Sequence, residues 1–400
     1  MTLRDKFAII GYGETPVTRA RVDRGEVKLS SQEYFAWAAQ LAIDDAGLDK
    51  KDFDGQGIAV TGTAYPHAEI WSAEVIQDLG FSPSLLIRAD HGGMGGASLL
   101  YQAGLAVTSG AVDLVLCIGA DAPMSITMPG AERAWRYESE FQKPFGMMRA
   151  NSQFAFIMRR HMYQYGTKPE QLGKIAIVQR EHAMKNPNSY MKQPLTMEQY
   201  LSSRMIADPV RLFDACIPVN GGLAFIVASK EKANKISKKE KTVSILGIAE
   251  SDNFIHGTRL RPDMTYTGVT DSAKKAFAMS GVDHKDIDFA QIYDDYTVAV
   301  LMQIEDAGFC EKSMGGKFLD EHDISYKGDL PVNTGGGQLS SGQPAMAGGL
   351  LHIVESVRQL RGEGGERQVK DASVGLATGV GAIAYGNSLA NSMTMIFERC

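Results

Sequence analysis

Cysteine is scarce in this sequence, and its four copies lie far apart. Cys117, Cys216, Cys310 and Cys400 form no CxxC pair and no tight cluster with histidine. Zinc fingers and disulfide frameworks need such spacings, so neither is predicted. Six histidines show no metal-ligand spacing, and we interpret them as structural: His161, His182, His256, His284, His322 and His352. We therefore expect a cytoplasmic protein that binds no metal.

Long apolar runs and an excess of basic residues are missing as well. No window of roughly 18 uninterrupted apolar residues occurs, and the opening MTLRDKFAII lacks the apolar core of a signal peptide. The net charge of −6 argues against a strongly basic surface for nucleic acid or anionic membranes. We therefore expect neither a nucleic acid nor a membrane as partner. A local basic patch could still hold phosphates, but the sequence does not place it.

The sequence does contain a clear alternation of strand and helix patterns. Residues 31–45 have a serine cap, apolar residues at helical spacing and Gly47 as a stop signal, which predicts a helix. A second helix is predicted over 98–108. Buried strands are predicted in KFAIIGYGETP, DGQGIAV, Leu85–Ile87, DLVLCIGAD, GGLAFIVAS and TVSILGIAE. This order of elements predicts an α/β fold.

One long segment interrupts the alternation. Residues 123–203 are rich in methionine, arginine and aromatic residues, and they carry helical patterns with little strand signal. We interpret this segment as an insertion that covers a site. The expected organisation is therefore an N-terminal half made of residues 1–122 and 204–245, the covering segment 123–203, and a C-terminal half made of residues 246–400.

A faint internal repeat relates the two halves. The stretch AAQLAIDDAGLDKKDFDGQGIAV at 38–60 is echoed by DSAKKAFAMSGVDHKDIDFAQIY at 271–293, with Gly47 matching Gly281 and Asp49 matching Asp283. A glycine-rich stretch, a helix and a buried strand follow each copy. The matched order of elements predicts a duplicated α/β unit.

The two glycine-rich stretches are the best candidates for a binding site. The first is HGGMGGA at 91–97, and the second is NTGGGQLSSGQPAMAGG at 333–349. Bare backbone amides at a helix start, together with the helix dipole, favour an oxyanion. A solvent-exposed loop with a helix cap is the alternative for either stretch alone. In a duplicated unit the two starts would lie around a pseudo-two-fold axis, so we expect them to converge on one site.

Several stretches carry a recognisable pattern: the opening AIIGYGETP, EHAMKNPNSY at 181–190, SRMIADPVRLFDAC at 203–216, QIYDDYTVAVLMQIEDAGFC at 291–310, VNTGGGQL at 332–339 and VRQLRG at 357–362. Together they resemble the thiolase superfamily, and most of all the sterol-carrier-protein-type thiolases and thiolase-like steroid side-chain aldolases. The resemblance implies a five-layered α-β-α-β-α arrangement of two related halves with an inserted loop domain. It also implies a homodimer and a small partner chain of the zinc-ribbon/OB-fold type.

The departures from the family's catalytic pattern concern the reactive residues. The position of the thiolase nucleophile falls at Gly92, and the Gly-His-Pro histidine falls at Gln343. The family's His-Asp-Cys-Phe matches Tyr293-Asp294-Asp295-Tyr296, so both reactive residues are replaced. Where thiolases often carry a second cysteine, the C-terminal stretch reads GLATGVGAIAYGN. A covalent acyl transfer therefore lacks its nucleophile at the expected place.

What remains is the means to bind a thioester and to stabilise its enolate, which also serves a retro-aldol cleavage. In the aldolases that this chain resembles, a tyrosine stands where Tyr293 stands, which implies a proton-transfer role for it. Asp294 or Asp295 is the expected ultimate base, although one of the two could instead cap the helix near Thr297. His91 is a candidate acid or a structural histidine. The expected substrate and oxyanion contacts are Asn333, Gly335, Gly336, Gln343, Gly92 and Gly93.

The predicted function is carbon–carbon lyase chemistry on a bulky β-hydroxyacyl-CoA, with CoA as part of the substrate and no further cofactor. Two alternatives stay open. One is a thiolase or acyltransferase with a displaced nucleophile, which would use Cys117, Cys216 or Cys310. We interpret all three as structural. The other is a subunit that binds acyl-CoA without catalysis.

Overall fold

The fold was analysed in a computed structural model that describes residues 2–63, 70–125, 143–147, 149–252, 254–255, 259–260, 263–381, 383–384, 388–389 and 391–400. His256 and part of the stretch GLATGVGAIAYGN lie outside these ranges. No helix in these ranges is both long and apolar enough to cross a membrane.

The first half of the chain alternates strands and helices as predicted. Its elements are β1 (Phe7–Glu14), α1 (Ser31–Ala46), β2 (Gly57–Thr61), α2 (Trp71–Leu79), β3 (Leu85–Ala89), α3 (Gly95–Thr108), β4 (Leu114–Asp121) and, after the insertion, β7 (Gly221–Ser229) and α7 (Lys230–Ile236). The ends of α1 follow local sequence signals. Ser30 and Glu33 form a capping box at its start, and Gly47 ends it in the left-handed conformation.

The second half repeats this alternation and ends on a long strand. Its elements are β8 (Val243–Asp252), β9 (Phe254–Ile255), β10 (Arg259–Leu260), α8 (Val269–Ser280), β11 (Phe289–Gln291), α9 (Thr297–Asp306), α10 (Gly315–Glu321), α11 (Leu350–Leu360), β12 (Val374–Val380), β13 (Ile383–Ala384), β14 (Ser388–Leu389) and β15 (Asn391–Arg399).

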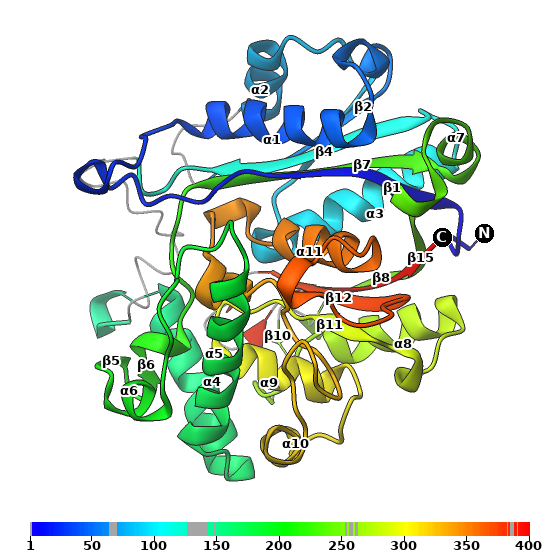
Figure 1. Ribbon diagram of the computed structural model, residues 1–400. Helices are drawn as coiled ribbons and strands as arrows, with labels where there is room; N and C mark the ends of the chain where they lie inside the picture. Colours follow the sequence, from blue (N-terminus) through cyan, green and yellow to red (C-terminus); the bar gives the residue numbers. More distant parts are fainter. Residues whose placement is uncertain are drawn as a thin grey trace.

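Helices dominate the described part of the inserted segment. It contains α4 (Arg149–Tyr165), α5 (Pro169–Lys185) and α6 (Met197–Ser202), followed by the short strands β5 (Met205–Ala207) and β6 (Val210–Arg211). Figure 1 shows these elements gathered at one side of the molecule, below the level of α11.

The nine main strands form a ladder in the order β11-β12-β15-β8-β1-β7-β4-β2-β3. Only Ala8 and Ile9 of β1 pair with β8, through Ser244 and Val243, so this junction joins two sheet halves. Helix α1 packs on the outer face of the first half, and α8 packs on the outer face of the second. Helices α3 and α11 lie between the halves, which completes the predicted five layers (Figure 1).

The starts of the two central helices touch each other. A Cβ atom added to Gly96 in α3 would lie 2.8 Å from the backbone of Gly349 and Leu350 at the start of α11. A Cβ atom added to Gly349 would lie 2.1 Å from the carbonyl oxygen of Gly93. These positions therefore accept only glycine without movement of the backbone. Helix α3 begins at Gly95, three residues before the predicted Ser98, because the glycine run itself takes helical conformation.

We expect Gly96→Ala to lower the free energy of unfolding by about 1–3 kcal/mol, because its Cβ atom would collide with backbone that cannot turn aside. Gly95→Ala is the matched control, since the nearest atom to its added Cβ, in Thr61, is 3.5 Å away. Urea unfolding followed by circular dichroism measures both variants. Equal stability of the two variants would contradict the close packing.

Candidate active site

The predicted catalytic residues lie on a short loop between β11 and α9. The strand ends at Gln291, so the chain is irregular from Ile292 onward. The Tyr293 amide donates to Thr378 Oγ1 at 3.0 Å, and the Tyr293 carbonyl accepts a hydrogen bond from Gln303 Nε2 at 2.7 Å. Both partners are buried, so the backbone at Tyr293 is held in place from two sides.

The phenol of Tyr293 lies against the first glycine-rich helix start. A Cβ atom added to Gly93 would be 2.0 Å from Tyr293 Oη, which means that the hydroxyl occupies space a side chain at position 93 would need. Gly93 belongs to the helical turn Gly92–Met94 that precedes α3. Burial, followed by the negative charge of Asp295, raises the pKa of Tyr293 well above its usual value. The phenol is therefore protonated at neutral pH and is a hydrogen-bond donor.

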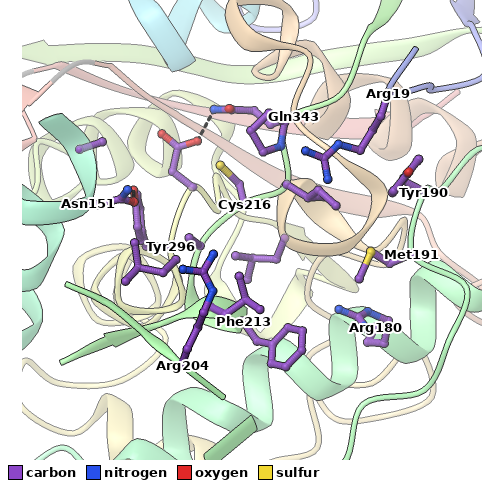
Figure 2. A pocket seen from close by; sticks show the side chains of 18 of the residues that line it. Arg19, Asn151, Arg180, Tyr190, Met191, Arg204, Phe213, Cys216, Tyr296 and Gln343 are labelled. Carbon is purple, nitrogen blue, oxygen red and sulfur yellow. Dashed lines mark hydrogen bonds between the residues drawn. The ribbon is translucent and has the colours of Figure 1, made fainter. Parts of the chain in front are cut away.

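Asp295 is the carboxylate that faces the cavity. Gln343 Nε2 donates to Asp295 Oδ1 at 2.5 Å, and both residues line a cavity of about 730 Å³ (Figure 2). Burial and the nearby charge of Asp294 raise the pKa of Asp295 to about 7, although its contacts with Tyr293, Cys216 and Gln343 lower it. A carboxylate that titrates near neutral pH can both accept and return a proton.

Asp294 points to a different place from Asp295. It is fully buried, and its two carboxylate oxygens accept hydrogen bonds from the backbone amides of Gln338 and Leu339 at 2.9 and 3.1 Å. His352 Nε2 lies 3.3 Å from the same carboxylate. Asp294 therefore holds the second glycine-rich segment and does not cap α9. Tyr296, the N-cap residue of α9, makes no side-chain capping bond within the described part of the chain.

Asn333 binds the backbone of the catalytic loop. Its side-chain Oδ1 accepts from the Ile292 amide at 2.6 Å, and its Nδ2 donates to the Ile292 carbonyl at 2.8 Å. Gly336 follows in the left-handed region, with φ of 97°, where an added Cβ would meet Ala183. Asn333, Gly335 and Gly336 are buried and do not belong to the cavity lining, so their predicted substrate contacts stay predictions.

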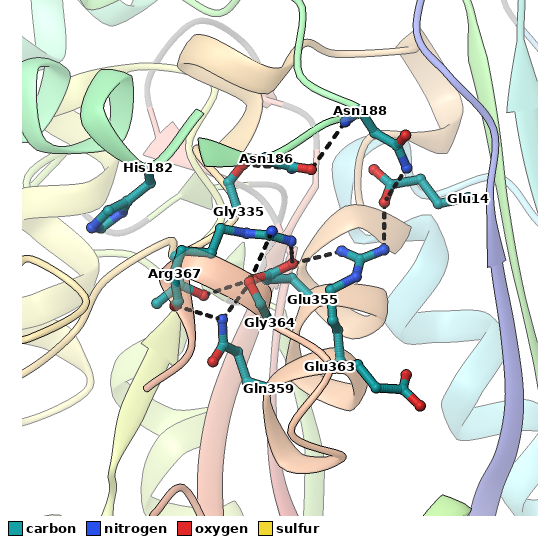
Figure 3. Close-up of polar contacts among 12 residues, drawn as sticks. Glu14, His182, Asn186, Asn188, Gly335, Glu355, Gln359, Glu363, Gly364 and Arg367 are labelled. Carbon is teal, nitrogen blue, oxygen red and sulfur yellow. Dashed lines mark hydrogen bonds and ion pairs between the residues drawn. The ribbon is translucent and has the colours of Figure 1, made fainter. Parts of the chain in front are cut away.

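A buried ionic network lies behind Gly335. Glu355 accepts hydrogen bonds from Arg358, Arg367, Gln359 and Thr334, at 2.6, 3.0, 2.9 and 2.9 Å (Figure 3). Burial alone would raise the pKa of Glu355, but the arginine charges outweigh it and lower the pKa to about 2. Arg358 also reaches Glu14 of β1 at 2.5 Å. The network therefore ties the first half of the chain to the loop at Asn333.

His182, which we interpreted as structural, supports the same loop. Its Nε2 accepts from the Tyr326 amide at 3.0 Å, so Nδ1 carries the proton and donates to the Asn333 carbonyl at 3.1 Å. Burial lowers the pKa of His182 to about 4. The ring is therefore neutral at physiological pH, and it fixes the loop without adding charge to the site.

His91 and Gly92 lie at the first helix start, beside Gly93. His91 is partly exposed and stands at the N-cap position of the turn Gly92–Met94, and its buried Nδ1 has no hydrogen-bond partner among the described residues. Of the ten predicted site residues, Asp295 and Gln343 line the cavity. Tyr293 adjoins both Asp295 and the turn of Gly93.

The cavity also has a lining that the sequence did not predict. Five arginines line it, from three separate segments of the chain: Arg19, Arg21, Arg24, Arg180 and Arg204. Asp295 is the one carboxylate among the described lining residues. No local pattern could have placed this basic patch, because the segments meet only in the folded chain.

Comparison with known proteins identifies the family of this chain. The model of the "Thiolase C-terminal domain-like" family matches residues 256–399. A steroid side-chain-cleaving aldolase of Thermomonospora curvata is 32% identical over 89% of this chain and 90% of its own length. The chain belongs to the thiolase superfamily. The acetyl-CoA acetyltransferase of Methanothermobacter thermautotrophicus is 30% identical over 95% of this chain and 97% of its own.

Among solved structures, this thiolase-superfamily chain is similar to an "Ltp2-ChsH2(DUF35) aldolase". The TM-score is 0.84 at 29% identity, over 98% of each chain. The predicted fold and the predicted resemblance to thiolase-like aldolases are thereby confirmed.

The four thiols of this thiolase-superfamily chain are all free, and they lie in different environments. Cys117 is fully buried in β4, and burial raises its pKa well above the usual value. Cys216 lines the cavity, and its backbone amide donates to the Asp295 carbonyl at 2.8 Å. Burial and the charges of Asp295 and Asp294 raise the pKa of Cys216 as well. A thiolate is therefore disfavoured at the one thiol near the predicted site.

We expect Gln343→Leu to raise the pKa of Asp295 above 7, because the variant removes a hydrogen bond that stabilises the ionised carboxylate. Carboxyl carbon NMR of protein labelled at aspartate, with Asp295→Asn for assignment, measures the titration. Gln338→Leu is the control, since the side-chain amide of Gln338 contacts His352 and not Asp295. An Asp295 pKa that falls or stays constant in Gln343→Leu would refute this coupling.

Proposed function

We propose that this protein is a retro-aldol lyase that cleaves a bulky β-hydroxyacyl-CoA into a shorter acyl-CoA and a ketone or aldehyde. The observation that carries the proposal is the pairing of a protonated tyrosine with a carboxylate whose pKa is about 7, at a helix start that bears glycine where thiolases bear cysteine. The two relatives named as aldolases support the same chemistry.

The proposed reaction moves one proton and breaks one bond. Asp295, in its ionised form, takes the proton of the β-hydroxyl, either directly or through Tyr293. The oxygen's electron pair forms the new carbonyl, the Cα–Cβ bond breaks, and its electrons pass to Cα as a thioester enolate. The proton then returns to Cα through the same pair. No acyl-enzyme and no co-reactant is needed, and the rate should rise with pH through about 7 as Asp295 ionises.

The enolate oxygen needs donors that are already in place. The first amides of a helix have no partner within the helix, so the turn at Gly92 and Gly93 is the proposed oxyanion site. Tyr293 Oη adjoins Gly93, which puts the proposed proton donor next to the proposed donors for the oxyanion. Gln343 serves mainly to orient Asp295 in this account.

A second candidate, acyl transfer through Cys216, has one observation in its favour. Cys216 lines the same cavity and is close enough to Asp295 for each group to affect the other's pKa. In this candidate Asp295 is the base that deprotonates the thiol. The raised pKa of the thiol weighs against this candidate.

Incubation with a branched β-hydroxyacyl-CoA, without free CoA and with any partner chain that co-purifies, tests the proposal. Mass spectrometry of the products should show cleavage by the wild type and by Cys216→Ala. Asp295→Asn and Tyr293→Phe should lose roughly 100-fold or more of the rate. Tyr165→Phe is a matched control, because its hydroxyl bonds Thr265.

Two other outcomes would replace the proposal. Cleavage only of a β-ketoacyl-CoA, dependent on free CoA and lost in Cys216→Ala, would establish acyl transfer. Binding of CoA with no turnover of either substrate would establish a non-catalytic subunit.

We also propose that the protein forms a homodimer through the edge strand β3. β3 ends the sheet order, and Leu86 on it is 41% exposed. Light scattering should give twice the 43.4 kDa of one chain, and Leu86→Lys should give a monomer. Val27→Lys, an exposed apolar site elsewhere, is the control. A monomeric wild type would contradict this assembly.

A zinc-ribbon/OB-fold partner is proposed as well, since the name of the similar solved structure, "Ltp2-ChsH2(DUF35) aldolase", includes a second component. A neighbouring reading frame for such a protein, whose product co-purifies in a constant ratio, is the expected observation. If the two chains, expressed together, separated during purification, this result would contradict the proposed complex.

A further inference from the structure

His352 lies beside the buried carboxylate of Asp294. It stands in α11 with 1% of its surface exposed, and its Nε2 lies 3.3 Å from Asp294 Oδ1. The ring is also next to the catalytic loop, since its centre lies 5.8 Å from the centre of the Tyr293 ring. A buried imidazole costs free energy unless polar groups satisfy it, so its place against a carboxylate needs an explanation.

Asp294 does not need His352 in order to hold its loop. The two oxygens of Asp294 already accept hydrogen bonds from the backbone amides of Gln338 and Leu339. These amides are neutral dipoles, so the negative charge of Asp294 still acts on its neighbours. After burial, this charge is the cause that raises the pKa of Asp295.

Of the described side chains around Asp294, only His352 can carry a positive charge. Asp294 and Gln179 of α5 would both lie within 2.7 Å of a Cβ atom added to Gly337, so a neutral amide faces the carboxylate on that side. The remaining titratable side chains near Asp294 are acidic ones, namely Tyr293, Asp295 and Cys216.

Other charges on α11 and on the elements packed against it have partners of their own. Glu355 binds Arg358 and Arg367, and Arg358 also binds Glu14 of β1. The strands β7, β11 and β12 pack against α11 and contain no ionisable side chain. The further ionisable groups are Arg361, which binds Asp45, Tyr12 of β1, Tyr101 of α3, and Glu398 and Arg399 at the end of β15. Asp294 is therefore the acidic partner of His352 in the described chain.

The side chain of Gln338 provides for a proton on the same ring nitrogen. Its Nε2 lies 3.3 Å from His352 Nε2, and its Oε1 is buried without a hydrogen-bond partner in the described chain. A half-turn of the amide brings Oε1 to the ring, where it accepts from a protonated Nε2. Asp294 Oδ1 and Gln338 Oε1 then both face the same N–H, which favours the imidazolium form.

We propose that His352 is a positioning residue whose positive charge compensates that of Asp294, so that Asp295 still ionises in the neutral range. The inference rests on the proposed function, since that function assigns the proton exchange to Asp295. Two buried carboxyl groups on consecutive residues oppose each other's ionisation. A cation 3.3 Å from one of them relieves this opposition without touching the substrate.

NMR titration of the Asp295 carboxyl carbon tests the inference without any turnover. His352→Leu should raise the pKa of Asp295 by about one unit from about 7, because the charge of Asp294 is then uncompensated. His352→Gln has a similar reach but carries no charge, and it should give most of the same rise. Ser356→Ala is the matched control and should leave this pKa unchanged, since its hydroxyl bonds the His352 carbonyl on the same helix.

The double variant Asp294→Asn/His352→Leu separates charge from packing. Asp294→Asn alone should lower the pKa of Asp295, because it removes the neighbouring negative charge. In the double variant the loss of His352 should no longer raise it, since no charge is left to compensate. The ascending limb of the cleavage rate against pH should move in the same direction as this pKa in each variant.

The outcomes separate this inference from the proposed function. An Asp295 pKa that keeps its wild-type value in both His352 variants would overturn the inference and leave the proposed function standing. A rise in His352→Leu that is absent in His352→Gln, or that persists in the double variant, would also overturn it, because hydrogen bonding or packing would then be the cause. Absence of cleavage by the wild type would overturn the proposed function, and the NMR titration would still decide the role of His352.

Discussion

The close approach of α3 and α11 determines where the parts of the site lie. Gly96 and Gly349 let the starts of α3 and α11 touch between the sheet halves. Gly93 contacts both Gly349 and Tyr293, which lies on the loop between β11 and α9. Because Tyr293 Oη fills the space beside Gly93, a side chain at that position and the tyrosine exclude each other. The phenol therefore lies beside the residue that follows Gly92, the position where a thiolase would carry its nucleophile.

Charge compensation separates the supporting residues from the reactive ones. Glu355 is surrounded by donors, and Asp294 is satisfied by two backbone amides, so both hold the loop at 333–341 in place. Asp295 and Arg180 are left without a full counter-charge, and both face the cavity. Perturbed charges of this kind cluster at sites where a ligand or a reaction uses them. This contrast is the physical basis for assigning proton transfer to the end of the cavity that holds Asp295.

Local signals predicted much of the fold but could not resolve the site. A serine cap and the stop at Gly47 predicted the ends of α1, where the structure has the cap at Ser30. The two glycine-rich stretches predicted the starts of α3 and α11, which touch each other. Asp294 and Asp295 looked alike in sequence, because only the turn of the chain after Gln291 sends one to backbone amides and the other to the cavity. The sequence could not predict the arginines that line the cavity either, since Arg19 and Arg180 are about 160 residues apart along the chain and meet only in the fold.

The central claim is that carbon–carbon cleavage proceeds without a covalent acyl-enzyme, and intact-protein mass spectrometry of rapidly quenched reactions tests it most directly. With a branched β-hydroxyacyl-CoA, the account predicts that shortened acyl-CoA and carbonyl product accumulate while the protein mass stays unchanged at every time point. A transient increase by the mass of an acyl group, located on Cys216, would contradict the account.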